Sequence, residues 1–160
     1  MAKITDRFFD CIMNYQYRRW QQKDISVICE LEQTVTAFPW SEKHYKDCWH
    51  AQYQGWVALS AKKIIGFILI QQIIDEYHIL NIAVANDYQR QGIGTQLFNT
   101  VITQGKENAI TTLLLEVRTS NDAAQHLYYR LGFNEIAVRK AYYPGKTTKE
   151  DAILMGLYLS

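Results

Sequence analysis

The sequence predicts an α/β protein, a mixed and mostly antiparallel central sheet flanked by helices, and three observations support this. Residues 55–60, 64–74 and 77–85 are β-rich apolar segments separated by short polar turns, which is typical of an antiparallel meander. The third segment continues through a Gly-containing loop into an amphipathic helix and then a strand at 111–117, a unit that normally makes a right-handed crossover to a parallel strand. A further helix then precedes two final β-rich segments, residues 133–140 and 152–159.

Length and composition favour one domain over residues 1–160, with a substantial core. The 17 basic and 16 acidic residues give a net charge of +1, so nothing in the charge balance suggests binding to nucleic acid or membranes. No apolar run is long enough for a membrane span, and the N-terminus lacks a signal-peptide pattern. We expect a cytoplasmic monomer.

The cysteines and histidines do not predict a metal site. Cys11, Cys29 and Cys48 are odd in number and lack the spacing of metal ligands or redox pairs, so we expect reduced thiols in a reducing compartment. The four histidines form no clustered ligand set. We therefore expect no metal.

The N-terminal third is expected to contain a strand and two helices. Residues 1–15 are an apolar but irregular extension to which we assign no role, and residues 17–20 read as a strand. Asp24 suits the N-cap of a first helix and Ser41 that of a second. Between them, the Phe38-Pro39-Trp40 cluster has two interpretations, the wall of a substrate groove or a hydrophobic staple.

The Gly-containing loop, Gln89-Arg90-Gln91-Gly92-Ile93-Gly94, is the main functional signal. It opens a helix whose apolar face recurs from Ile93 and which we expect to end at Gly105. Unpaired amides and the helix dipole make such an N-terminus an anion site, and Arg90 can add a charged contact. We infer a cradle for the pyrophosphate of a nucleotide-like cofactor, although a plain strand-to-helix turn would give the same pattern.

Two better-known cradles do not fit. A Walker loop requires Lys and then Ser or Thr after its last glycine, but Thr95-Gln96 follow here. A dinucleotide fingerprint requires a third glycine where this chain has Leu97.

Two side chains are candidates for proton transfer. Glu116 lies in the apolar segment Leu113–Arg118, where burial would raise a carboxyl pKa toward that of a general base. Its other interpretation is an ion pair with Arg118, Arg90 or Arg139. Tyr128 lies two turns into a helix capped by Ser120 or Asn121, where its phenol can serve as a general acid or simply pack in the apolar stripe.

The loop Gln89–Gly94 resembles the acetyl-coenzyme A (acetyl-CoA) loop of the GCN5-related N-acetyltransferases. Further segments resemble, within that superfamily, the bacterial ribosomal-protein-alanine N-acetyltransferases: residues 37–43, 81–94, 115–118, 120–121, 127–128, 131–135, 142–144 and 150–153. Residues 1–15 extend beyond the family pattern.

The resemblance implies a splayed parallel strand pair that admits acetyl-CoA, with Glu116 as proton acceptor and Tyr128 as proton donor. It implies an acceptor that is the α-amine of an N-terminal alanine on a small-subunit ribosomal protein, attacking directly in a ternary complex. It assigns cofactor contacts to Ile82, Ala83, Val84, Arg90, Gln91, Gly92, Ile93, Gly94, Thr95 and Asn121, and acceptor contacts to Phe38, Trp40, Tyr142 and Tyr143. The alternatives are acetylation of a lysine, polyamine or other small amine on the same fold, and a non-catalytic acyl-CoA sensor.

Overall fold

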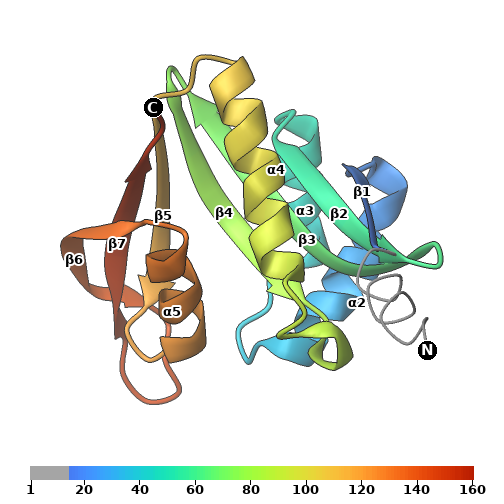
Figure 1. Cartoon of the computed structure of the whole chain (residues 1–160). Coiled ribbons are helices and arrows are strands. Elements are labelled where there is room, and N and C mark those ends of the chain that lie inside the picture. Colours follow the sequence, from blue (N-terminus) through green and yellow to red (C-terminus); the bar gives the residue numbers. More distant parts are fainter. Residues whose placement is uncertain (1–14) are drawn as a thin grey trace, which may run out of the picture.

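The computed structural model describes residues 15–160, and these residues form the predicted mixed sheet (Figure 1). The sheet has seven strands in the order β1-β2-β3-β4-β5-β7-β6, and only β4 and β5 are parallel neighbours. The strands are β1 (Tyr15–Arg19), β2 (Gln54–Ser60), β3 (Lys63–Ile73), β4 (Glu76–Val84), β5 (Thr112–Arg118), β6 (Asn134–Tyr143) and β7 (Glu150–Tyr158). The helices are α2 (Ile25–Val35), α3 (Glu42–His50), α4 (Ile93–Glu107) and α5 (Asp122–Arg130), with short 3-10 turns η1 (Gln22–Asp24) and η2 (Asn86–Tyr88).

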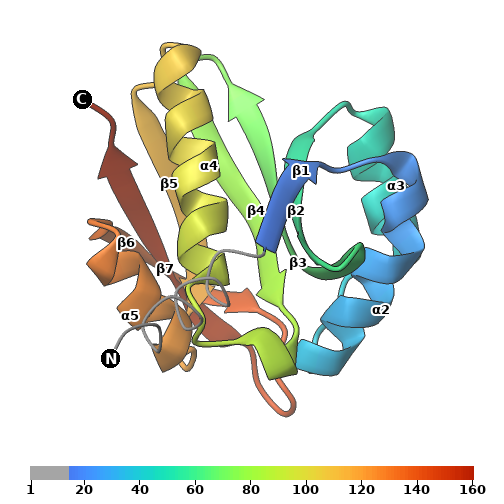
Figure 2. The same cartoon turned by 45° about the vertical axis from the view of Figure 1, so that its right-hand side comes forward.

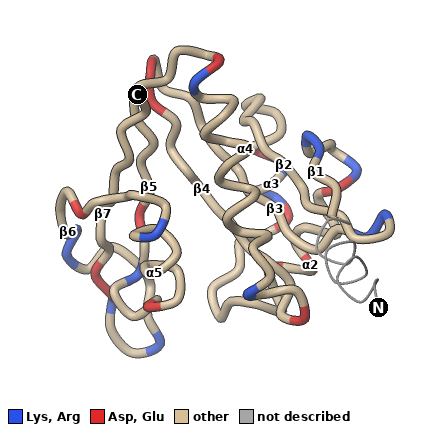
Figure 3. The backbone as a smooth tube through the Cα atoms, viewed as in Figure 1, with Lys and Arg blue, Asp and Glu red and all other residues tan. Residues whose placement is uncertain are grey.

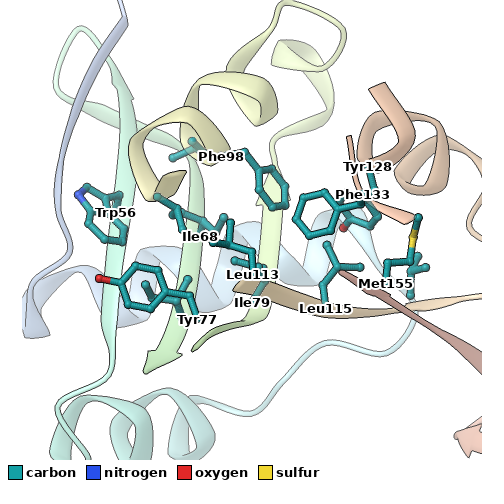
Figure 4. Packing of buried hydrophobic residues seen from close by; sticks show 14 of the residues in the cluster. Trp56, Ile68, Tyr77, Ile79, Phe98, Leu113, Leu115, Tyr128, Phe133 and Met155 are labelled. Atoms are coloured by element: carbon teal, nitrogen blue, oxygen red, sulfur yellow. The ribbon is translucent and has the colours of Figure 1, made fainter. Parts of the chain in front are cut away.

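Helices cover both faces of the sheet (Figures 1 and 2). Helices α4 and α5 lie on one face, where Phe98, Leu115, Tyr128 and Phe133 belong to one buried cluster (Figure 4). Helices α2 and α3 lie on the opposite face, over a second cluster that includes Phe67. Burial of two apolar layers therefore stabilises the sheet from both sides.

The parallel pair β4–β5 is joined over only part of its length. Residues Glu76–Ile79 pair with Thr112–Leu115, and beyond them the two strands diverge, as Figure 1 shows. The divergence begins at Leu80, an extra residue in β4 that produces a register shift against β3. Such a bulge bends a strand and increases its twist. The expected splay is therefore present and coincides with a local irregularity of the backbone.

Three predicted details require correction. The α4 helix continues past Gly105 to Glu107, and a Cβ at Gly105 would lie 2.9 Å from Leu159, so close packing rather than a helix end explains the glycine. Asp24 occupies the N-cap of α2 but makes no capping bond, because its carboxylate accepts from the Gln21 amide and pairs with Arg18. Tyr15 begins β1, and residues 1–14 of the proposed extension lie outside the described part of the chain.

Other predicted helix ends are confirmed. The Ser41 hydroxyl accepts from the His44 amide at 3.2 Å, and the Asn121 side chain accepts from the Ala124 amide at 3.2 Å. Within residues 15–160, no helix is long and apolar enough to cross a membrane. The same part of the chain holds no group of three or more potential metal ligands.

Candidate functional site

The expected cradle lies where β4 leads through η2 into α4. Gly92 is the N-cap, with φ +81°, and no side chain caps this helix. The first helical hydrogen bond is donated by the Gln96 amide to the Gly92 carbonyl, so the preceding amides have no intrahelical acceptor. Apart from Gly92 and its two chain neighbours, no residue of the described part of the chain has an atom within 4 Å of where a Gly92 Cβ would be. The N-terminus of α4 therefore has free amide donors, and the backbone at Gly92 is open on the side where a Cβ would project, as an anion site needs.

The charge near this helix end suits an anion. Along β4 and α4, acidic and basic residues occur only at the ends remote from the splay, at Glu76, Lys106 and Glu107 (Figure 3). The connecting loop contributes the exposed Arg90 as well as Asp87. Because α4 begins without a carboxylate in its first turn, its dipole is available to an external anion.

The splay exposes one edge of β4. Ile82, Ala83 and Val84 pair with β3 on one side, while β5 no longer pairs with them on the other. Their backbone groups on that side have no strand partner, which suits an extended arm and the carbonyl of a thioester. These residues, the loop and the start of α4 together surround the open end of the strand pair. Asn121 lies at the N-terminus of α5, where its side chain serves as the cap.

Glu116 and Tyr128 lie on opposite faces of the sheet. Burial alternates along β5: Leu115 and Val117 belong to the cluster under α4 and α5, whereas Glu116 is only half-buried. Side chains alternate along a strand, so Glu116 faces away from those helices. Tyr128 projects from α5 into the cluster, beside Phe98 and Phe133 (Figure 4).

The Glu116 carboxylate is paired with Arg139, which was one of the ion-pair alternatives. Its Oε1 lies 3.1 Å from Arg139 Nε, and its side chain is 21% exposed. Hydrogen bonding to Glu116, together with burial, raises the pKa of the Tyr142 phenol. Burial and the charge of Glu116 raise the pKa of Tyr143 to about 12. Glu116 thus lies in a polar group of one cation and two neutral phenols.

The ring of Tyr128 is packed in the core, as one interpretation predicted, while its hydroxyl makes no hydrogen bond within residues 15–160. Its side chain is 6% exposed, and its ring packs edge-on against Phe98 at 5.5 Å. Burial, and then the neighbouring Tyr143, raises the pKa of the Tyr128 phenol above its ordinary value. Within residues 15–160 its hydroxyl has no hydrogen-bond partner, whereas the exposed Tyr129 donates to Glu135.

The four aromatic residues expected at the acceptor separate into two places. The rings of Phe38 and Tyr143 both pack against the Arg118 guanidinium, and Tyr142 contacts Tyr143 with ring centres 4.9 Å apart. Trp40 instead stacks on His44 and packs against Tyr45 in α3. The contact expected of a hydrophobic staple is therefore present at Trp40, while Phe38 packs against Arg118.

One buried polar network was not predicted. Glu32 is 3% exposed, and its carboxylate accepts from the Trp40 amide at 3.0 Å, from Asn81 Nδ2 at 2.9 Å and from the Tyr45 hydroxyl. The network joins α2, the α2–α3 loop and the bulged part of β4. Its signal is in the sequence: Glu32 falls seven residues after Ile25, on the apolar stripe of α2.

The two described cysteines are not placed for catalysis. Cys29 on α2 and Cys48 on α3 are buried free thiols, and burial raises the pKa of each. A raised pKa reduces the thiolate fraction, which is the nucleophilic form.

Comparisons with known proteins agree with this geometry. The family described as "Acetyltransferase (GNAT) family" matches residues 18–133. The chain is 42% identical to the "[Ribosomal protein bS18]-alanine N-acetyltransferase" of Escherichia coli K12, over 86% of this chain and 93% of that protein. It is 31% identical to a putative protein of the same description from Bacillus subtilis, over 86% and 91%.

The chain is also similar to solved structures of N-acetyltransferases. The crystal structure of the ribosomal-protein-S18-alanine N-acetyltransferase from Escherichia coli superposes with a TM-score of 0.86 and 39% identity, covering 91% of this chain and 94% of that one. Arabidopsis thaliana NAA60 in complex with acetyl-CoA shares the fold, with a TM-score of 0.80 and 16% identity over 91% and 98% of the chains. This chain therefore belongs to the acetyltransferase (GNAT) family and is an acetyl-CoA-dependent N-acetyltransferase.

Proposed function

We propose that this enzyme acetylates the α-amine of an N-terminal alanine on a small-subunit ribosomal protein, the counterpart of bS18. The observation that supports this most strongly is the 42% identity to the Escherichia coli bS18-alanine enzyme, which extends over 93% of that protein. The placement of Glu116, Phe38, Tyr142 and Tyr143 on one side of β5 agrees with an acceptor that approaches from the face opposite α4 and α5.

In this proposal the splay is the passage between two faces of the sheet. Acetyl-CoA supplies an acetyl group activated as a thioester. The α4 N-terminus would hold its pyrophosphate, and the free edge of β4 at Ile82, Ala83 and Val84 would hold the arm that carries the thioester. Backbone amides on that edge would stabilise the oxyanion that forms during attack. The acceptor amine would approach from the Glu116 side.

The two proton transfers then take place from opposite faces of the sheet, one at Glu116 and one at Tyr128. As the amine forms its bond to the acetyl carbon, Glu116 takes up the proton that the nitrogen loses, directly or through one water molecule. As the carbon–sulfur bond breaks, Tyr128 donates its phenolic proton to the departing sulfur from the other face. The raised pKa of Tyr128 keeps the donor protonated at neutral pH. No covalent enzyme intermediate is needed, and neither Cys29 nor Cys48 lies at the site.

The test is acetyl transfer followed by intact-mass spectrometry. The mixture contains the enzyme, acetyl-CoA and one of three peptides: one beginning with Ala, one beginning with Met, and an acetyl-Ala peptide with an internal lysine. We expect transfer to the free Ala peptide alone. Modification of the blocked peptide would move the acceptor to lysine, and modification of the Met peptide alone would contradict the alanine assignment.

The two proposed roles are tested with paired variants. Glu116→Gln and Tyr128→Phe should each lower kcat/KM about 100-fold, the usual scale for general acid–base catalysis, while acetyl-CoA still binds. Glu107→Gln and Tyr129→Phe are the matched controls, because both residues are exposed and Glu107 lies at the remote end of α4. Loss of less than threefold in Glu116→Gln would remove it as the base.

A pH series separates base catalysis from a structural effect. An α-amine has an ordinary pKa near 7.7–8.0, so above about pH 9 it needs no base. The deficit of Glu116→Gln should therefore be larger at pH 6.5 than at pH 9. An equal deficit at both values would indicate that Glu116 acts by another route.

A further inference from the structure

At the open end of the splay, Arg118 links two segments that are far apart in the sequence. Its Cζ lies 4.3 Å from the ring centre of Phe38, in the α2–α3 loop, and 4.5 Å from that of Tyr143, at the end of β6. Phe38 comes from the half of the chain before β4, and Tyr143 from the half after β5. At this end β4 and β5 share no backbone pairing, so the sheet itself does not fix one half against the other.

The guanidinium of Arg118 is held through one nitrogen by residues of the second half of the chain. Arg118 Nη1 donates to the Pro144 carbonyl at 2.8 Å and to Glu150 Oε2 at 3.2 Å. The other oxygen of Glu150 accepts from the Ser120 amide at 2.8 Å. The same guanidinium therefore donates two hydrogen bonds and packs against two aromatic rings, a combination that the ammonium group of lysine, which is not planar, cannot reproduce.

Arg118 lies close to the proposed base, Glu116, on the face of β5 where the acceptor is proposed to bind. The two residues are two apart on β5 and project to the same face. The side chain of Arg118 is only 19% exposed, and that of its partner Glu150 is 23% exposed, so the pair is shielded from full solvation. The two rings that contact Arg118 therefore lie beside the face from which the proposed acceptor would reach Glu116.

We propose that Arg118 is a positioning residue: by packing against both Phe38 and Tyr143, it fixes the α2–α3 loop against the β6–β7 connection and thereby sets the affinity for the acceptor. The proposal rests on the proposed function, in that the acceptor amine approaches on the Glu116 face. Arg118 does not touch the reacting atoms. Its effect is therefore confined to acceptor binding and to the order of the two segments.

Steady-state kinetics give the first test. Arg118→Gln should raise KM for the Ala peptide about tenfold or more, since both stacked contacts are lost, with KM for acetyl-CoA unchanged and kcat within about threefold. Arg118→Lys should resemble Arg118→Gln, because it keeps the charge but not the planar faces. A fall in kcat with an unchanged acceptor KM would overturn the proposal, and so would full rescue by lysine.

Arg19 provides a matched control. Its Cζ lies 4.1 Å above the ring of Trp56, and its guanidinium donates to Gln54 and Gln104, so it too is a stacked and hydrogen-bonded arginine. It lies on β1, at the far side of the sheet from β5. Arg19→Gln should leave both KM values unchanged.

Hydrogen exchange tests the same link without any acceptor. In Arg118→Gln, amide exchange should rise in residues 36–41 and also in residues 143–149, although more than 100 positions separate them. A rise in one segment alone, or a rise spread along β5, would overturn the proposal. If both segments respond while the wild-type enzyme acetylates no Ala peptide, the acceptor assignment fails and the link between the segments stands.

Discussion

Replacement of Glu32 by alanine gives a direct measure of how the buried network stabilises the fold. Glu32→Ala removes the acceptor for three donors, namely the Trp40 amide, Asn81 Nδ2 and the Tyr45 hydroxyl. A buried donor left without a partner costs about 1–3 kcal/mol. Tyr45 and Asn81 retain their own contact at 3.1 Å, so the three losses do not simply add.

We expect Glu32→Ala to lower the free energy of unfolding by about 3 kcal/mol, a large share of the roughly 5–15 kcal/mol that stabilises a domain. The corresponding fall in Tm is about 10 °C. Glu32→Gln should cost about 1 kcal/mol, because one oxygen still accepts while the new amide faces the Asn81 donor.

Urea unfolding followed by tryptophan fluorescence supplies the measurement, with Glu30→Gln as the control. Glu30 lies on the same helix but is exposed, so its replacement should change the free energy of unfolding by less than about 0.5 kcal/mol. If Glu32→Ala costs less than about 1 kcal/mol, water replaces the carboxylate easily and the network does not stabilise the loop.

Three other predictions address the sheet and the site. Gly55→Ala should lower the free energy of unfolding, measured in urea, by about 2 kcal/mol. The reason is that the new Cβ would lie 2.9 Å from the Ile68 carbonyl oxygen and 2.4 Å from the Leu69 side chain. An unchanged free energy of unfolding would mean that the strands separate at little cost. Hydrogen bonds from Ser120, and then from Arg118, lower the pKa of the Glu150 carboxyl group. The ionised Glu150 therefore stabilises the fold fully above the ordinary carboxyl pKa near 4.3. This stabilisation is lost as the pH falls through the lowered pKa of Glu150. The difference in unfolding free energy between wild type and Glu150→Gln should therefore be constant above about pH 5.5 and shrink below about pH 4; a constant difference throughout would exclude this linkage. Because the pKa of Tyr128 is raised, its phenol stays protonated at high pH. The value of kcat should therefore show no decline below about pH 10. A decline of kcat near pH 8 would argue against Tyr128 as the proton donor.

The strand positions and the glycine-containing loop before α4 were accessible from the sequence because they depend on local rules. Apolar runs bounded by polar turns predicted β2, β3 and β4 to within one or two residues. The glycine at the N-cap of α4 has a positive φ that other residues rarely adopt, which is why the loop is recognisable in a single sequence. Gly105 was misread because a glycine near a helix end and a glycine under a packed side chain look the same in sequence.

The partners of Glu116 were not accessible in the same way. Three arginines were possible, and the choice of Arg139 depends on the register of β6 against β7. That register shifts twice, between Glu135 and Ala137 and between Arg139 and Tyr143. A one-residue change in register moves a side chain to the opposite face, and no local pattern in the sequence specifies these bulges. Long-range pairing, rather than propensity, decided the environment of the proposed base.

The proposed division of the site between two faces depends on the splay of the sheet. In a fully paired sheet, Glu116 and Tyr128 would be separated by a continuous layer of backbone, and no single reacting centre could reach both. The β4–β5 pairing ends at Leu115, beside the bulge at Leu80, so the layer of backbone opens from Glu116 onward. The opening also removes backbone hydrogen bonds that would otherwise hold the halves together. An additional link at that end is then required, and Arg118, between Phe38 and Tyr143, is where the structure provides one.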